Sequence, residues 1–205
     1  MKYQKNNQVT IVIPVHGKQE YIERCLLHYS KTMPDLGIDV IFFDSSDQPY
    51  EISVAPFKYL YFGPENNREK FFLILEHINT EYMVIAASDD LLLSTAIIEC
   101  VDYLNKNADY SAAHGYHLEI DEKTGTIINP AYTKRPFLNH KNGIEYPKDA
   151  ADRLREYFQL PNFQMLNHAV LRKEAWALAM DRYKNIELKK LSAYAYSDFT
   201  QGVAI

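Results

Sequence analysis

The feature that most constrains the fold is a series of short apolar runs, most of which end in small or acidic residues. The β-branched run at 9–15 (VTIVIPV) is followed by 38–43 (IDVIFF), a shorter candidate at 58–62, and 82–87 (YMVIAA). Apolar runs without polar alternation are typical of strands that are buried on both faces of a parallel sheet. The sequence therefore predicts an α/β protein with a Rossmann-like, mostly parallel central sheet.

Helical periodicity follows the first, third and fourth of these runs. A second helix is predicted over 67–79, and a third begins at Ser94, whose hydroxyl is expected to cap its first turn. Strands and helices of these lengths predict right-handed parallel crossovers, so helices should flank the sheet. The first helix, between Lys18 and Lys31, has its apolar residues at i, i+1, i+4, i+5 and i+8, namely Tyr21, Ile22, Cys25, Leu26 and Tyr29.

The rest of the chain has weaker patterns. Its length of 205 residues fits a single domain spanning 1–205, and no internal repeat is visible. Because the end at 202–205 carries no helix cap, we expect the chain to be cut from a longer protein. The predicted elements are, in order, a strand at 110–120, a hairpin turn at 121–125, a long loop at 131–147, a helix near 149–159, a strand near 165–171 and helices from Glu174 onward.

Charge and composition exclude several functional classes. The formal net charge of -5 and the absence of a basic cluster on one face argue against nucleic-acid binding. Cys25 and Cys100 lie among apolar residues, so we expect buried thiols rather than a disulfide or a metal framework. No apolar run approaches the roughly 20 residues of a membrane span, and the polar start lacks the core of a signal peptide. We expect a cytoplasmic protein that can associate peripherally with the inner face of a membrane.

Polar clusters follow three of the predicted strands. They are Val15-His16-Gly17, Asp44-Ser45-Ser46 and Ser88-Asp89-Asp90. In an open α/β sheet, ligands bind beyond the carboxyl ends of the parallel strands, where helix N-termini present N–H groups. These clusters are therefore the candidate site.

The adjacent carboxylates Asp89 and Asp90 are the strongest chemical signal. Two such groups at the end of an apolar strand repel each other and are costly to desolvate, so a positive partner is expected. Mg²⁺ or Mn²⁺ would take one or two carboxylates and complete its shell with water and phosphate oxygens. From spacing alone, turn formation and capping before Ser94 explain the pair equally well.

Three further candidates have open alternatives. Asp44 could accept hydrogen bonds from a nucleoside, although turn formation is the commoner role for such an aspartate. Arg68 and Lys70 begin a helix, where the dipole disfavours cations, so an anionic partner and a plain surface position are both open. His114 and His117 would lie on opposite faces of a strand and should not share a metal. The other histidines, including His168, are interpreted as packing or surface residues.

Taken together, these segments resemble the glycosyltransferase family 2 group, whose fold is GT-A. VTIVIPVHGKQEYIERCL is similar to the opening strand and helix, and IDVIFFDSS to the second strand, which ends in a nucleotide-contacting aspartate. EYMVIAASDDLLL resembles the metal-motif strand, and ADYSAAHGYHLEI a strand that follows it in a bacterial subgroup. No glycine-rich phosphate loop, Gly-x-Ser-x-Gly elbow or paired-cysteine motif points elsewhere.

The resemblance implies roles for individual residues. The family's first acid would fall at Ala87, which cannot ligate a metal, so the match depends on the Ser-Asp-Asp variant. The later carboxylate that acts as general base in inverting members matches Asp198, with Glu187 as a competitor. The implied donor-binding residues are Pro14, Val15, Asp44, Lys70, Ser88 and Asp89, and the implied ligands of Mn²⁺ or Mg²⁺ are Asp89 and Asp90.

The resemblance thus implies a metal-dependent, inverting glycosyltransferase. It would move a sugar from a nucleotide-sugar donor to an acceptor hydroxyl on a surface polysaccharide or glycolipid. One alternative is a non-catalytic nucleotide-sugar-binding or scaffold domain of a multidomain polysaccharide synthase, which Ala87 and the abrupt end keep open. Another is a sugar-phosphate nucleotidyltransferase, but its glycine-rich loop is poorly matched by residues 15–18.

Overall fold

The computed structural model describes residues 8–51, 53–66, 70–115, 119–121, 123–129 and 168–185. The chain divides into two compact units. One contains Met1–His114 and Gln164–Ile205, and the other contains Gly115–Phe163. The predicted loop at 131–147, the helix near 149–159, Arg68, His117, Glu187 and Asp198 all lie outside the described residues.

A six-stranded sheet forms the first unit, in the order β3-β2-β1-β4-β8-β5. Strands β1, β2, β3 and β4 are mutually parallel, whereas β8 is antiparallel to both of its neighbours. The α/β class and the mostly parallel sheet predicted from the apolar runs are confirmed. The strands are β1 (Val9–Val15), β2 (Asp39–Asp44), β3 (Lys58–Tyr61), β4 (Tyr82–Ile85), β5 (Ala112–Ala113) and β8 (Val170–Arg172).

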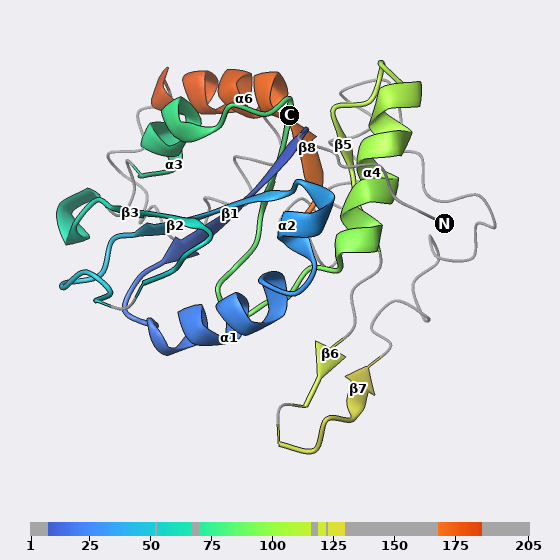
Figure 1. Ribbon diagram of the computed structural model, residues 1–205. Helices are drawn as coiled ribbons and strands as arrows, with labels where there is room; N and C mark the ends of the chain where they lie inside the picture. The colour runs from blue at the N-terminus through green and yellow to red at the C-terminus, as the bar shows by residue number, and fades with distance from the viewer. Residues whose placement is uncertain are drawn as a thin grey trace. The chain divides into compact units, whose positions relative to one another are not determined.

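Helices cover both faces of this sheet. In Figure 1, α1 lies below the strands β1, β2 and β3, and α3 and α6 lie above them. Helices α1 (Glu20–Tyr29), α2 (Met33–Leu36) and α4 (Ser94–Lys106) contribute to one buried cluster. The other buried cluster includes residues of η2 (Ile74–His77) and α6 (Lys173–Asn185). The 3₁₀ helix η2 directly follows α3 (Lys70–Leu73), and a separate 3₁₀ turn, η1, covers Pro64–Asn66.

Strand β1 shows how its sequence creates the two layers. Its side chains alternate across the sheet, so Ile11 and Ile13 join the cluster under α1 and Val12 joins the cluster under α6. All three side chains are fully buried. A run without polar alternation is therefore what a central strand with helices on both faces requires.

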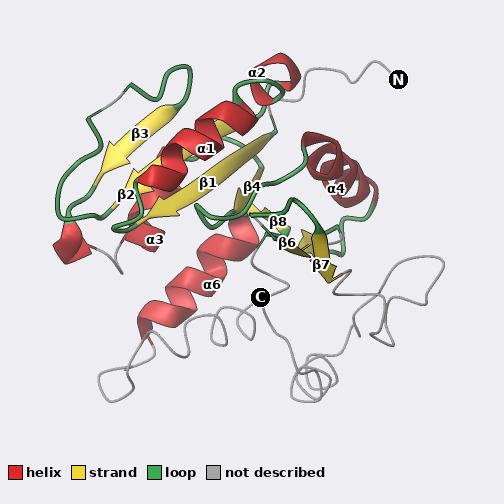
Figure 2. Cartoon of the chain, turned by 90° about the horizontal axis from the view of Figure 1, so that it is seen from below, coloured by secondary structure: helices red, strands yellow, loops and turns green. Residues whose placement is uncertain are grey.

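The order in which consecutive strands are added to the sheet reverses after β3. From β1 the chain moves outward to β2 and β3, and it then returns to place β4 on the other side of β1. Figure 2 shows β3, β2 and β1 side by side, with α1 running along them. A crevice is expected at the carboxyl ends of the two strands that flank such a reversal.

Two predictions for the region after β4 are wrong. The predicted strand at 110–120 is two separate short strands, β5 and β6 (Glu119–Ile120), which belong to different sheets. Ser94 is the first residue of α4 rather than its cap. The cap position is Leu93, no side-chain hydrogen bond caps that helix, and the Ile97 amide donates to the Leu93 carbonyl at 3.1 Å.

The described part of the second unit is a hairpin of β6 and β7 (Ile127–Asn129). Its turn falls at the predicted 121–125 segment. Asp121 Oδ1 accepts hydrogen bonds from the amides of Lys123 and Thr124, and these bonds lower the pKa of its carboxyl. Gly125 takes the left-handed conformation, with φ of 66°, that closes the turn.

The helices in the described residues are all too short or too polar to cross a lipid bilayer. Cys25 is buried and Cys100 is partly buried, and both are free thiols. Burial raises the pKa of each to about 11, so both remain protonated at neutral pH.

Candidate functional site

The sheet opens between β1 and β4 beyond Val12. The last β1–β4 pair is Val12 with Ile85, whereas β1 and β2 remain paired to Val15 and Asp44. The Val12 carbonyl accepts from Ala86 on the β4 side, so by alternation the backbone nitrogen of Pro14 also faces that side. Proline lacks an N–H, and at this point no ladder bond is lost. Pro14 therefore marks the start of the opening.

Asp44 ends β2 and is completely buried. Its Oδ2 accepts hydrogen bonds from Tyr59 Oη at 2.7 Å and Gln19 Nε2 at 3.0 Å, and its Oδ1 accepts from the Ser46 amide at 2.7 Å. Burial raises the pKa of the Tyr59 phenol, so this group keeps the proton that it donates. The carboxylate joins β2, β3 and the loop after β1, and it also forms the turn at Ser46.

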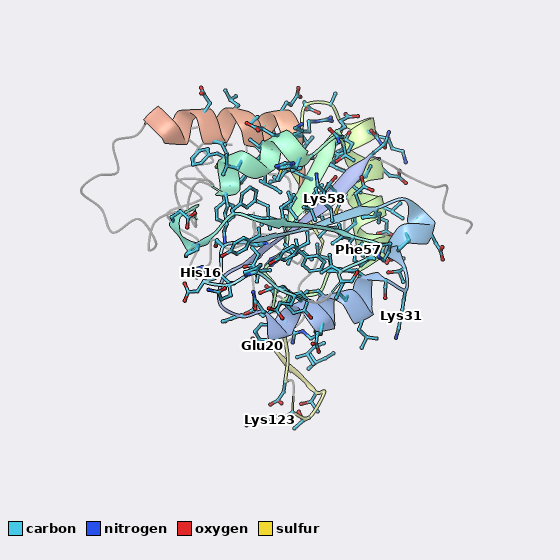
Figure 3. The ribbon with its side chains drawn as sticks, turned by 60° about the vertical axis from the view of Figure 1, so that its left-hand side comes forward. His16, Glu20, Lys31, Phe57, Lys58 and Lys123 are labelled. Atoms are coloured by element: carbon cyan, nitrogen blue, oxygen red, sulfur yellow. The ribbon has the colours of Figure 1, made fainter. Side chains whose placement is uncertain are left out.

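The Ser46 hydroxyl and the Ser45 carbonyl hold the loop after β1. The Gly17 amide donates to Ser46 Oγ at 2.8 Å, and His16 Nδ1 donates to the Ser45 carbonyl at 2.8 Å. His16 lies at the end of the sheet where α1 begins near Glu20 (Figure 3). The predicted clusters after β1 and β2 are therefore directly connected.

Lys70 reaches the same place from the first turn of α3. Only 3% of the residue is exposed, and its ammonium donates to Ser45 Oγ at 2.8 Å and to the Val15 carbonyl at 3.2 Å. The rings of Phe43 and Phe71 lie 5.5 and 5.7 Å from Nζ. Burial lowers the pKa of Lys70 to about 8, and attraction to Asp44 opposes the shift. The surface alternative for Lys70 is wrong.

The depressed pKa of Lys70 predicts a characteristic dependence of stability on pH. The unfolded chain holds this proton up to about pH 10.4, whereas the folded protein releases it near pH 8. Between these values the unfolded state binds more protons, so the free energy of unfolding should rise with pH, by at most about 3 kcal/mol. Denaturant titrations of the wild type and Lys70→Met at several pH values in this interval measure the difference.

Other groups titrate over the same range, so the effect lies in the difference between the two proteins. Lys106→Met, at the exposed end of α4, is the matched control and should keep the wild-type dependence. Parallel curves for wild type and Lys70→Met would show that Lys70 does not lose its proton on folding.

The loop after β4 is held by one side of α1. Arg24 donates to the Asp89 carbonyl, and Cys25 Sγ donates to the Ser88 carbonyl at 3.3 Å. One turn later, His28 Nε2 donates to the Leu92 carbonyl at 2.8 Å, and Tyr29 Oη accepts from the Leu92 amide at 3.2 Å. These helix residues follow the i, i+1, i+4, i+5 pattern, so α1 fixes the backbone that carries the two acids.

The two acidic side chains have different partners. Asp89 Oδ2 lies 3.7 Å from Lys18 Nζ, and Asp90 Oδ2 lies 2.9 Å from His168 Nε2. Both carboxylates remain about half exposed, at 48% and 53% of the side chain. Lys18 follows β1, so its contact joins the acidic loop to the loop at His16 and Gly17.

His168 lies beside the candidate site, and the sequence interpretation did not place it there, because it treated the remaining histidines as packing or surface residues. It lies just before β8, only 15% of its side chain is exposed, and its amide donates to the Ile85 carbonyl at 3.1 Å. Its φ of 76° is unfavourable for a residue other than glycine, and such strain is often stored at functional sites. Sequence periodicity cannot reveal that His168 lies beside Asp90, because that contact depends on the antiparallel pairing of β8 with β4.

Asp89 and Asp90 are of a type and number that could serve a divalent cation shared with a ligand, and metal binding by them stays a prediction. Among the described residues, no group of three or more His, Cys, Asp or Glu side chains could hold a metal on its own. Asp89 and Asp90 provide two half-exposed carboxylates on adjacent residues. That is the number of protein ligands Mg²⁺ usually takes when substrate phosphates and water complete its shell.

Comparison with known proteins adds a limited likeness. No protein-family model matches the sequence, and no curated protein matches it either. Among solved structures, the chain is similar to that of TarS from S. aureus. The TM-score is 0.40 and the sequence identity is 14%, and the matched region covers 48% of this chain and 20% of that one.

Proposed function

We propose that this protein transfers a sugar from a nucleotide-sugar donor to an acceptor hydroxyl. The observation that carries the proposal is the joining of three strand ends at one edge of the sheet. Lys70 contacts the ends of β1 and β2, and Lys18 links the loop after β1 to Asp89 after β4. This edge flanks the point where the strand order reverses, which is where open α/β sheets bind nucleotides.

In this proposal the nucleoside binds beside Pro14, Val15 and Asp44. Asp44 has three internal hydrogen bonds, and the one from Gln19 is the most replaceable, because that side chain is half-buried and lies in the loop after β1. A ligand N–H or hydroxyl can take the place of the Gln19 amide without uncovering the carboxylate. Lys70 then supports the diphosphate side by placing a buried positive charge behind the Ser45 hydroxyl.

The acidic loop provides the metal-binding part of the proposal. Asp89 and Asp90 would hold Mn²⁺ or Mg²⁺ with the donor's diphosphate, and Ser88 would line the donor beside them. When bound, the cation supplies Lewis-acid stabilisation of charge on the leaving diphosphate. His168 orients the Asp90 carboxylate through its contact with Oδ2.

The transfer step forms a bond between the acceptor oxygen and the anomeric carbon. The bond from that carbon to the diphosphate oxygen breaks, the nucleoside diphosphate leaves, and the acceptor proton passes to a carboxylate. We assign the general base to Asp198, with Glu187 as the competitor. In-line attack with a single displacement would invert the anomeric centre, and the acceptor would be a growing surface polysaccharide or a glycolipid.

A nucleotide screen in the presence and absence of Mn²⁺ tests the donor site. We expect one nucleoside diphosphate to raise the melting temperature with Mn²⁺, and to bind at least about tenfold more weakly without it, since the acids alone leave phosphate charge unneutralised. Thermal shift finds the nucleotide, and calorimetry measures its affinity with and without the metal.

The corresponding nucleotide sugar then separates catalysis from binding. Release of nucleoside diphosphate from it indicates a glycosyltransferase. Binding without any release, in the full-length protein with acceptors supplied, would favour the scaffold alternative. Absence of metal-dependent binding by every nucleotide would reject the donor site itself.

A further inference from the structure

A second binding site is suggested by a hollow at the opposite, amino edge of the sheet. Its volume is about 520 Å³, within the range of small-molecule sites. In Figure 3, Phe57 and Lys58 lie away from His16, on the side toward Lys31. The strands contribute their first residues to the hollow, which is lined by Thr10, Pro34, Gly37, Ile38, Asp39, Val40, Ile41, Pro56, Phe57, Lys58, His77 and Asn79.

One part of the hollow is cationic. Lys58 Nζ lies 3.4 Å from His77 Nδ1. Because an ammonium can only donate, Nδ1 is the acceptor and the ring proton of His77 is on Nε2. Among the described residues, no salt bridge joins Lys58 or His77 to a carboxylate. An ammonium and a ring N–H are thus the groups that an anionic oxygen would meet.

The rest of the hollow carries groups that can bind a hydroxylated ring. Ile41 pairs with Lys58 in the sheet, and Asp39 lies two residues before Ile41. Asp39 therefore shares a face with Lys58 at the start of the neighbouring parallel strands. The carboxylate of Asp39 can accept hydrogen bonds from hydroxyls, and the Asn79 amide can donate or accept.

We propose that this hollow binds a sugar phosphate, with the phosphate at Lys58 and His77 and the sugar hydroxyls at Asp39 and Asn79. An anion alone would not use Asp39, which would repel it. A neutral sugar would not use the pair of nitrogen donors as fully. The proposal is independent of the donor site, because the two sites lie at opposite ends of the parallel strands.

Calorimetry with glucose 6-phosphate, inorganic phosphate and glucose tests the inference. Glucose 6-phosphate should bind at least about threefold more tightly than either of the other two. Lys58→Met should weaken it by at least about tenfold, since a charge-assisted contact is lost. Asp39→Ala should remove its advantage over inorganic phosphate. Backbone amide NMR shifts should cluster at Thr10, Asp39 and His77.

Two control variants locate the ligand. Lys106→Met, on the exposed end of α4, should bind glucose 6-phosphate like the wild type. Lys70→Met, at the carboxyl edge, should also bind it normally, once its melting temperature without ligands shows that the buried substitution leaves the protein folded. Equal binding of all three probes, unchanged binding by Lys58→Met, or loss of binding in Lys70→Met would each overturn the proposal. None of these results depends on whether the protein transfers sugars.

Discussion

Replacing Asp90 by Asn should lower metal-dependent release of nucleoside diphosphate by at least about 100-fold. Loss of one group that stabilises developing charge costs this much in enzymes where it has been removed singly. Asn keeps the size of the side chain but has neither the charge that Mn²⁺ needs nor a second acceptor oxygen. The measurement is steady-state turnover with the nucleotide sugar identified by the screen, across a range of Mn²⁺ concentrations.

A carboxylate outside the site provides the control for Asp90. Glu99 lies on the exposed side of α4, so Glu99→Gln should keep wild-type turnover. Asp90 is half exposed, so Asp90→Asn should remain folded, and its melting temperature without ligands checks this. Turnover of Asp90→Asn within about twofold of the wild type would exclude Asp90 as a metal ligand, and Asp89→Asn would then be the decisive variant.

The central sheet was predictable because its signal is local. Residues 9–15 form a run of seven without a charge, which is typical of a strand in a parallel sheet that helices cover on both faces. The antiparallel β8 was placed only approximately, as a strand near 165–171, because its pairing with β4 and β5 joins segments far apart in sequence.

The predicted positions of the candidate site follow from the same rule. Polar residues at the ends of parallel strands must share one edge, and the structure does bring Asp44, Lys70 and Asp89 to that edge through Val15, Ser45 and Lys18. Whether these residues bind a nucleotide sugar stays a prediction.

The burial of individual polar groups was not predictable. Lys70 is buried because α3 begins over Phe43 of β2, and the ring of Phe71, the next residue in α3, lies beside its ammonium. Helical periodicity predicts the face of a helix but not how deeply its first turn is buried. The position of His168 depends on the tertiary contact between the end of β4 and the start of β8, which the sequence pattern does not show. Both side chains lie beside strand ends, and the positions of both depend on packing between distant segments.

Replacing Asp44 by Asn should destabilise the protein by about 3 kcal/mol. Asn can still accept from the Ser46 amide through its oxygen, but its NH₂ then faces Tyr59 and Gln19, which both donate to Oδ2 in the wild type. At a fully buried position, donors left without an acceptor cost about 1–3 kcal/mol each, more where the lost acceptor was charged. Urea unfolding at neutral pH, with the slope checked for equality, measures the change.

The neighbouring Asp47→Asn is the control for Asp44, because Asp47 is exposed, and it should change stability by less than about 0.5 kcal/mol. Tyr59→Phe removes one of the donors to Asp44 and should relieve part of the loss when combined with Asp44→Asn, so the two effects should not add. Strict additivity would mean that the carboxylate does not hold Tyr59. A stable Asp44→Asn variant that loses nucleotide binding would show that Asp44 acts on the ligand alone. The hydrogen bond from Gln19 would then not contribute to the stability of the fold.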